Sequence, residues 1–214
     1  MVPYVNIHTH KPCNIPIEVV NMVDPSTIPD HGLFSFGIHP WNIARTDVDA
    51  DLRDLENICD EKKIIALGEI GLDKVIDTDL ELQASVFLKQ IHIANQYRLS
   101  VIIHCVRAWS ELAFLSKHYP AVKPWIYHGF TGNEPIAQQI IRRGHFVSFG
   151  EALLKSPKLQ QVFIKLPLDF IFFETDDSDE KIEAIYKKAA ELRHICTDEL
   201  KETIHRNFET LFTL

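Results

Sequence analysis

Ile64-Ile65-Ala66-Leu67-Gly68-Glu69-Ile70-Gly71 is the stretch of this chain that decides its fold. Its first four residues are apolar, and so are those of Phe170-Ile171-Phe172-Phe173 nearer the carboxyl end. A strand with no polar alternation is typical of a parallel sheet that is covered on both faces. The sequence therefore predicts an α/β protein built on a parallel sheet.

Similar apolar, β-branched or aromatic runs recur along the chain, and helical periodicity fills most of the gaps between them. Ser156-Pro157 predicts a helix start, as does a capping box from Thr78 to Glu81. This alternation predicts a (β/α)8 TIM barrel. The first two connections are too short and proline-rich for crossover helices, which makes the barrel compact there. The expected strands are residues 2–7, 18–23, 33–38, 63–69, 100–104, 124–128, 145–149 and 169–174.

Composition restricts the class of protein. A length of 214 residues with 46% hydrophobic residues predicts one domain, residues 1–214. No apolar run reaches membrane-spanning length and the first residues do not form a secretion signal, so we expect a cytoplasmic protein with no membrane partner. The four cysteines form no C-x-x-C pair and are expected as free thiols. A net charge of −8 disfavours a broad basic surface for nucleic acid.

Polar residues follow the apolar runs where a barrel places its catalytic groups. His8 and His10 are two apart, so on a strand both point to one face, as two imidazole ligands of one ion require. Solvated or hydrogen-bonded histidines are the alternative. Glu69 lies between Gly68 and Gly71, where a buried carboxylate is costly unless it is paired or binds a metal. A salt-bridged Glu at the barrel rim is the alternative there.

The later strands add further donors. His104 and His128 end apolar runs at equivalent places, and each alone is more often a satisfied core histidine. Asp176 follows the last predicted strand in an acidic string that also fits a solvated helix start. Together these residues predict a divalent-metal site with a bridging Glu, of the kind that activates water for attack on a phosphoryl or carbonyl group.

The chain resembles the TatD family of metal-dependent deoxyribonucleases and phosphoesterases, within the amidohydrolase-like barrels. The resemblance spans nearly the whole chain, and the pairing of Gly-Glu-Ile-Gly-Leu-Asp with Glu-Thr-Asp is its most specific part. The matching motifs are Asn6-Ile7-His8-Thr9-His10, Gly37-Ile38-His39-Pro40, Gly68-Glu69-Ile70-Gly71-Leu72-Asp73, His104-Cys105, His128-Gly129-Phe130-Thr131-Gly132, Glu174-Thr175-Asp176 and Asn207-Phe208.

The resemblance implies two divalent ions, of Mg, Mn or Zn. One would be held by His8, His10, Glu69 and Asp176, and the other by Glu69, His104 and His128. Asp176 and the bridging Glu69 would be catalytic, with Asp176 orienting or deprotonating the attacking water. The residues expected to support these ligands or contact substrate are Asn6, His39, Trp41, Arg107 and Glu174.

Three departures from the family pattern affect the expected substrate. Asn6 stands where members usually carry Asp, which removes a carboxylate beside His8 and His10. The loop after His104 has its Arg shifted by one place, to Arg107, and lacks the Asp that usually follows. After Asp176 the chain continues as Asp177-Ser178-Asp179-Glu180 instead of a proline-rich loop with basic residues.

Three functions remain open on these grounds. The first is a two-metal phosphodiesterase that acts on DNA ends, with help from Arg107, Lys74 or Arg142. The second is a hydrolase of a small amide, lactone or phosphate ester, which needs no basic groove. The third is a non-catalytic descendant that binds a metal or partner. No ligand is lost, so we rank the third last, and no obligate protein partner is evident.

Trp41 directly follows His39-Pro40 and has two interpretations. It stacks on a base, or it closes the barrel mouth as a loop plug. Trp109 and Trp125 have apolar neighbours and are expected in the core.

Overall fold

The computed structural model describes residues 2–212 and divides into two compact units. The terminal unit combines Met1–Val20 with Tyr127–Leu214, and the central unit is Asn21–Ile126. The predicted single domain over residues 1–214 stays a prediction, and its outermost three residues lie outside the described part of the chain. Each unit is described by itself below.

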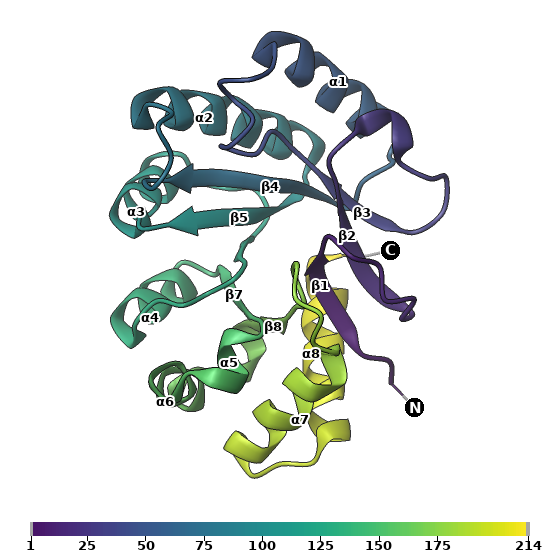
Figure 1. Ribbon diagram of the computed structural model, residues 1–214, viewed down its shortest axis with the longest axis vertical. Helices are drawn as coiled ribbons and strands as arrows, with labels where there is room; N and C mark the ends of the chain where they lie inside the picture. The colour runs from purple at the N-terminus through teal and green to yellow at the C-terminus, as the bar shows by residue number, and fades with distance from the viewer. Residues whose placement is uncertain (1, 213–214) are drawn as a thin grey trace. The chain divides into compact units, whose positions relative to one another are not determined.

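The eight predicted strands are all present, in the order β1 to β8. Most of them are followed by a helix, and Figure 1 shows this alternation of strands and helices. This alternation, with parallel pairing of neighbouring strands, confirms the (β/α)8 class. The strands are β1 (Val5–Thr9), β2 (Ile17–Met22), β3 (Leu33–Phe36), β4 (Ala66–Asp73), β5 (Ser100–Val106), β6 (Trp125–Tyr127), β7 (Phe146–Phe149) and β8 (Ile171–Phe173).

The compact start of the barrel is also confirmed. The β1–β2 connection contains no helix, and the β2–β3 connection has only the short 3-10 helix η1 (Pro25–Thr27). A second 3-10 helix, η2 (Leu168–Phe170), precedes β8. The α-helices are α1 (Val48–Asp60), α2 (Leu80–Tyr97), α3 (Trp109–His118), α4 (Glu134–Arg142), α5 (Ala152–Lys155), α6 (Pro157–Lys165), α7 (Ile182–Arg193) and α8 (Thr197–Leu211).

In the central unit, β4 pairs with β3 on one side and β5 on the other, and α2 packs on β4 (Figure 1). Helix α2 begins at Asp79, whose side chain accepts hydrogen bonds from the amides of Glu81 and Leu82. The predicted capping box at Thr78 is therefore wrong by one residue, because Asp79 is the residue whose carboxylate reaches the free amides.

β4 is longer than its apolar run, and this corrects the predicted strand end at residue 69. All eight of its residues are buried, and the pairing with β5 continues to Asp73 opposite Val106. The register shifts between Leu67 and Ile70, so that β4 has one residue more than β5 over this interval. Such a bulge redirects side chains locally, and here it lies at Glu69.

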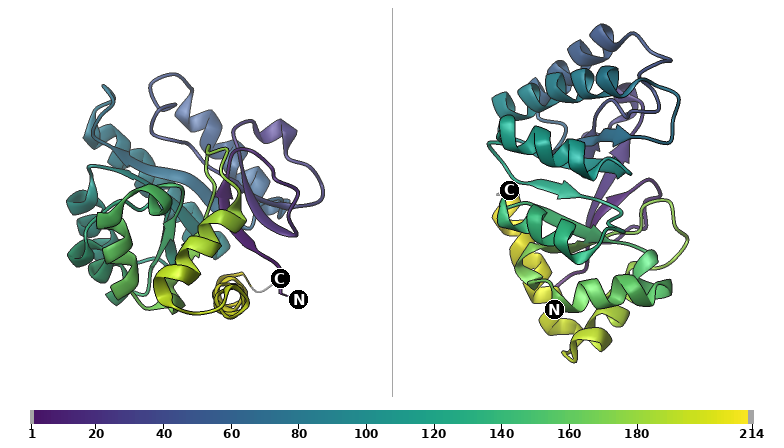
Figure 2. Two further views of the ribbon diagram at one scale, coloured as in Figure 1. Left: turned by 60° about the horizontal axis from the view of Figure 1, so that its bottom comes forward. Right: turned by 90° about the vertical axis from the view of Figure 1, so that its left-hand side faces the viewer.

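In the terminal unit, β7 pairs with β8, and the segment after β8 returns to β1. Thr9 and Asp176 form a parallel bridge, so the first and last strands of the barrel meet within this unit. Helices α7 and α8 lie side by side and pack on β8 (Figure 2). The buried Tyr186 of α7 hydrogen-bonds both backbone groups of Val5, which fixes β1 to this layer.

Among the described residues, the longest helices carry too many polar side chains for any of them to cross a lipid bilayer.

Candidate metal centre

The donor set of the central unit is His39, Glu69 and His104, whose ligand atoms lie within 4.8 Å of one another. Glu69 is almost fully buried, and its Oε1 lies 3.2 Å from His39 Nε2 and 2.5 Å from His104 Nδ1. One carboxylate oxygen is thus shared by two imidazoles. A buried carboxylate needs such partners, and two imidazoles with a carboxylate are also a common ligand set for divalent ions.

The hydrogen bonds of His39 define its tautomer. Its Nδ1 accepts from the backbone amide of Trp41 at 3.2 Å, so Nδ1 carries a lone pair and the proton of the neutral ring is on Nε2. His39 Nε2 therefore donates to Glu69, and it would serve as a metal ligand only where an ion replaces that proton. This places His39 beside the predicted bridging carboxylate, where it orients Glu69; contact with substrate stays a prediction.

Asp73 adjoins this donor set and was not among the predicted site residues. Its Oδ2 lies 3.3 Å from His104 Nε2 and accepts from Trp41 Nε1 at 2.7 Å. Burial raises the pKa of Asp73, but hydrogen bonds from Trp41, the Val75 amide and His104 outweigh that effect and lower it overall. The signal was present in the sequence, because Asp73 ends the Gly-Glu-Ile-Gly-Leu-Asp motif. A carboxylate behind a metal-binding histidine fixes the ring orientation.

The glycine at position 71 lets β4 approach β5 at His104. A Cβ at Gly71 would overlap the backbone carbonyl of His104, so no other residue fits without moving the strand. Gly71 is thus a packing requirement for the position of His104.

Cys105 does not add a thiolate to this set. Burial raises the pKa of the Cys105 thiol to about 12, with a smaller opposing effect from the Ala108 amide. The thiol stays protonated at neutral pH, and a protonated thiol is a poor ligand and nucleophile. The four cysteines are free, as predicted.

Two other predicted site residues of the central unit are exposed. Trp41 is 55% exposed although its indole N–H is bound by Asp73. Arg107 follows β5 with a left-handed backbone, φ 54°, and its side chain is exposed. The structure thus leaves both side chains accessible, and a role in substrate binding stays a prediction for each.

The donor set of the terminal unit is built on β1 and the segment after β8. His8 and His10 approach the same atom, Asp176 Oδ1, at 3.5 and 3.6 Å from their Nε2 atoms. The predicted common face of these two histidines is therefore confirmed. The backbone explains it, because the Asp176 amide donates to the His8 carbonyl and the His10 amide donates to the Asp176 carbonyl.

His128 joins this set from the end of β6. Its ring centroid lies 4.4 Å from that of His8, and His8, His128 and Asp176 offer ligand atoms within 4.8 Å of one another. His128 Nδ1 lies 3.5 Å from Glu174 Oε1, which also accepts the Gly129 amide at 2.5 Å. Glu174 is fully buried and faces His128 through this oxygen, and an orienting role for it stays a prediction.

The side chain of Asn6 binds Thr175, in the segment after β8, through both ends of its amide. Its Nδ2 donates to Thr175 Oγ1 at 2.8 Å, and its Oδ1 accepts the Thr175 amide at 3.0 Å. Thr175 Oγ1 in turn donates to Thr9 Oγ1 at 3.0 Å. Because both ends of the amide are used, Asn6 holds the segment of Thr175 against β1, and an Asp would supply only acceptors.

Both donor sets pass a chemical test for a divalent ion. Each unit brings at least two imidazoles and one carboxylate within coordination reach, and such nitrogen and oxygen ligands suit Zn, Mn or Mg to different degrees. The chain therefore has candidate metal ligands in both units. The number and identity of the ions stay predictions.

A cavity of about 360 Å³ adjoins Asp176 in the terminal unit. It is lined by the loops after β6, β7 and β8, including Gly129 and Gly150. Four carboxylate residues contribute to its wall, namely Glu151, Glu174, Asp176 and Asp177. Of the residues that the structure describes, no lysine, arginine or histidine lines it. This wall repels a phosphate more than it attracts one, except where a metal ion intervenes.

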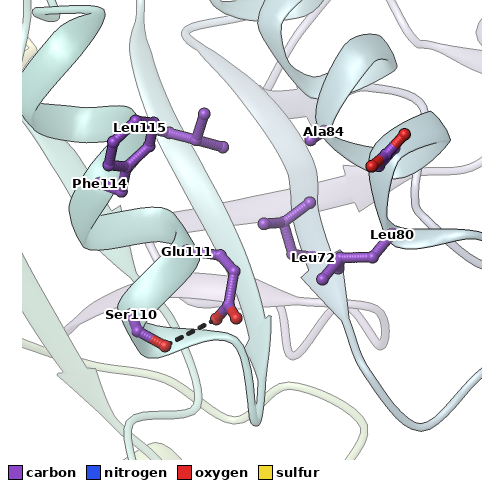
Figure 3. A pocket seen from close by; sticks show the side chains of 8 residues that line it. Leu72, Leu80, Ala84, Ser110, Glu111, Phe114 and Leu115 are labelled. Carbon is purple, nitrogen blue, oxygen red and sulfur yellow. Dashed lines mark hydrogen bonds between the residues drawn. The ribbon is translucent and has the colours of Figure 1, made fainter.

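A cavity of similar volume in the central unit lies between α2 and α3 (Figure 3). Its wall is mainly apolar, with Leu72, Leu80, Ala84 and Phe114 around a hydrogen bond from Ser110 to Glu111. None of the donor residues of the central unit lines it.

Comparison with known proteins identifies the family. The family model described as "TatD related DNase" matches residues 17–213, which is most of the chain. The chain belongs to the TatD-related DNase family.

Relatives and solved structures agree with this TatD assignment. The "Uncharacterized metal-dependent hydrolase YjjV" of Escherichia coli K12 is 28% identical over 198 residues, which are 84% of this chain and 76% of YjjV. The crystal structure of YjjV superimposes with a TM-score of 0.89 at 23% identity, over 99% of this chain and 98% of that one. A TatD-family hydrolase from Entamoeba histolytica gives 0.80 at 20% identity, over 91% and 84%.

A further relative has a more specific name. The "3'-5' ssDNA/RNA exonuclease TatD" of Erwinia tasmaniensis is 26% identical over 153 residues, which are 69% of this chain and 59% of that protein. The predicted family, the barrel fold and the class of metal-dependent hydrolase are thus confirmed. The assignment of individual ligands stays a prediction.

Proposed function

We propose that this TatD-family chain is a divalent-metal-dependent phosphodiesterase that removes nucleotides from DNA ends. The observation that supports it most is the pair of donor sets, His39–Glu69–His104 and His8–His128–Asp176, each within 4.8 Å. The family name and the name of the Erwinia relative favour DNA over other esters.

The residues suggest a division of work. A bound divalent ion would supply Lewis acidity and lower the pKa of a water molecule. Asp176 has a side chain that is 41% exposed, so it can reach a water molecule and accept its proton while His8 and His10 hold the carboxylate from the other side. His39 keeps Glu69 oriented, and Asp73 does the same for His104.

The family resemblance supports two divalent ions, of Mg, Mn or Zn. The residues of the two donor sets would hold them, and Glu69 would be the ligand that both ions share. We also place the enzyme in the cytoplasm, acting on DNA ends without an obligate protein partner.

A hydrolase of a small phosphate ester, amide or lactone is the second candidate. The acidic wall of the terminal-unit cavity favours it, because Glu151, Glu174 and Asp177 do not attract a polyanion. The net charge of −8 also weakens the long-range attraction between this chain and DNA.

The test is degradation of end-labelled single-stranded DNA by the purified chain with Mg²⁺ or Mn²⁺, beside reactions with EDTA and with Glu69→Gln. Metal-dependent shortening from one end by the native chain alone is the expected result. No shortening by a protein that has bound its metal would contradict the proposal, and metal-dependent turnover of small esters by that same sample would then establish the second candidate.

A further inference from the structure

Trp41 is an exposed ring held rigidly beside the donor set of the central unit. We propose that its indole face stacks on a base of the substrate, which makes Trp41 the residue that distinguishes a nucleotide from a phosphodiester without a base. This inference rests on the proposed function and adds to it the residue that holds the base.

The indole is fixed by its polar atom. Its Nε1 donates to Asp73 Oδ2 at 2.7 Å, and Asp73 is 2% exposed. A hydrogen bond to a buried carboxylate is charge-assisted and holds the ring in one orientation. The ring therefore loses little conformational freedom when a ligand binds it.

The apolar part of the same side chain remains in solvent. Trp41 is 55% exposed, whereas Trp125 is fully buried. A ring that closes the barrel mouth as a loop plug would have less exposed surface, so the exposure of Trp41 favours stacking over that alternative. A rigid, solvent-exposed aromatic face matches the stacking platforms of proteins that bind single-stranded nucleic acids.

The position of the ring relates it to the chemistry. Its centroid lies 5.0 Å from that of His39 at an interplanar angle of 87°, and 6.1 Å from that of His104. Because the two imidazoles meet the indole nearly edge-on, they support the ring without stacking on it. A base on this ring lies next to the donor set, so a single nucleotide can place its base on Trp41 and its phosphate at the donors.

The electrostatics of the chain make such a contact valuable. The net charge of −8 gives little general attraction for a phosphate backbone. Stacking does not depend on charge and tolerates any base, because every base has a π-face. It therefore suits an enzyme that trims ends of varied sequence.

The test compares two oligomers of equal length and charge, an oligothymidylate and an abasic tetrahydrofuran-phosphate chain, each labelled with the same fluorophore. Both oligomers carry the same hydrolysis-resistant phosphorothioate linkages, so binding is measured by anisotropy with Mn²⁺ present and without turnover. We expect the native chain to prefer the oligothymidylate by roughly 5- to 150-fold, the range given by loss of one stacked base. Trp41→Leu should remove that preference and leave the affinity for the abasic chain unchanged.

Two further variants test whether the preference depends on an aromatic ring at position 41. Trp41→Phe keeps a ring but loses the hydrogen bond to Asp73, and it should retain most of the preference. Tyr119→Leu is the matched control, because Tyr119 is an exposed aromatic residue of the same unit, 47% exposed, that follows α3. It should behave as the native chain.

The outcomes separate this inference from the proposed function. A preference that survives in Trp41→Leu, or is absent from the native chain, overturns the stacking role, even if DNA ends are hydrolysed. A preference that Trp41→Leu abolishes supports the stacking role even if the DNA degradation assay shows no cleavage.

Discussion

The two units hold similar donors in different ways. In the central unit the imidazoles are tied to carboxylates by side-chain contacts of 2.5 to 3.3 Å, from His39 and His104 to Glu69 and Asp73. In the terminal unit the corresponding distances to Asp176 are 3.5 and 3.6 Å, and the backbone bonds between β1 and Asp176 set the arrangement.

This difference separates function from stability. In the central unit the donors are oriented by hydrogen bonds among themselves and to Asp73, directly beside the proposed metal ligands, so substitutions there change the chemistry first. In the terminal unit the donors depend on a supporting frame that includes Asn6 and Thr175, so substitutions in that frame change the stability first. Four substitutions test this distinction.

Glu69→Gln should have the largest effect, a loss of hydrolytic rate on the order of 10²- to 10³-fold. The amide carries no negative charge and has an NH2 donor in place of one carboxylate oxygen, so it binds a divalent ion and the rings of His39 and His104 less strongly. The rate of release of labelled nucleotides measures the loss, and circular dichroism checks the fold. Glu111→Gln is the control, because Glu111 is a surface carboxylate of the same unit. Equal turnover in both variants would contradict the role of Glu69.

Asp73→Asn should lower the rate or the metal affinity by roughly 10- to 100-fold, which is typical for the partner of a metal-binding histidine. Asn has one acceptor oxygen where Asp73 has two, so it cannot satisfy Trp41, the Val75 amide and His104 together. Metal titration followed by kinetics separates the two effects. A change in unfolding free energy with normal kinetics would instead place Asp73 among the purely structural residues.

His145 tests the terminal unit by pH. Burial, with a smaller contribution from Arg143, lowers the pKa of His145 to about 4 from an ordinary 6.5. The unfolded chain therefore binds the proton first as the pH falls, and stability is lost between about pH 6.5 and 4. Between pH 7 and 5 the loss from this group is about 2 kcal/mol. Urea unfolding of His145→Gln should show a pH dependence that is weaker by that amount, and an unchanged slope would contradict the assignment.

Asn6→Asp should cost about 1 kcal/mol of unfolding free energy, because it removes a buried donor to Thr175 and adds a buried charge. Metal affinity should change less than the stability does, since the structure directs Asn6 at Thr175. Urea unfolding and metal titration of the same samples measure both quantities. If metal affinity rises while stability is unchanged, Asn6 acts on the donors after all.

The sequence predicted the barrel well because its signals are local. Runs such as Phe170-Ile171-Phe172-Phe173 identify buried strands, and the two-residue spacing of His8 and His10 identifies a common face. The end of β4 was misjudged because a register shift between Leu67 and Ile70 depends on β5 and leaves no periodic trace.

The contacts that orient the donors could not be predicted, because they join residues that are far apart in the sequence. The bonds of Asp73 to Trp41 and of Asn6 to Thr175 join residues 32 and 169 positions apart. Only the fold brings such groups together, so residue type and spacing identify the candidate donors better than the partners that orient them. The family motif contained Asp73, but its partner was not visible from the sequence.

The most direct test of the account is the metal content of three variants after loading with Mn²⁺ and removal of the excess by gel filtration. Glu69→Gln and Asp176→Asn each alter one donor set, and Asp179→Asn alters a surface carboxylate paired with Lys11. We predict that the native chain and Asp179→Asn retain the same amount of metal, and that each of the other two retains less. Equal retention by all four proteins would contradict the assignment of both donor sets.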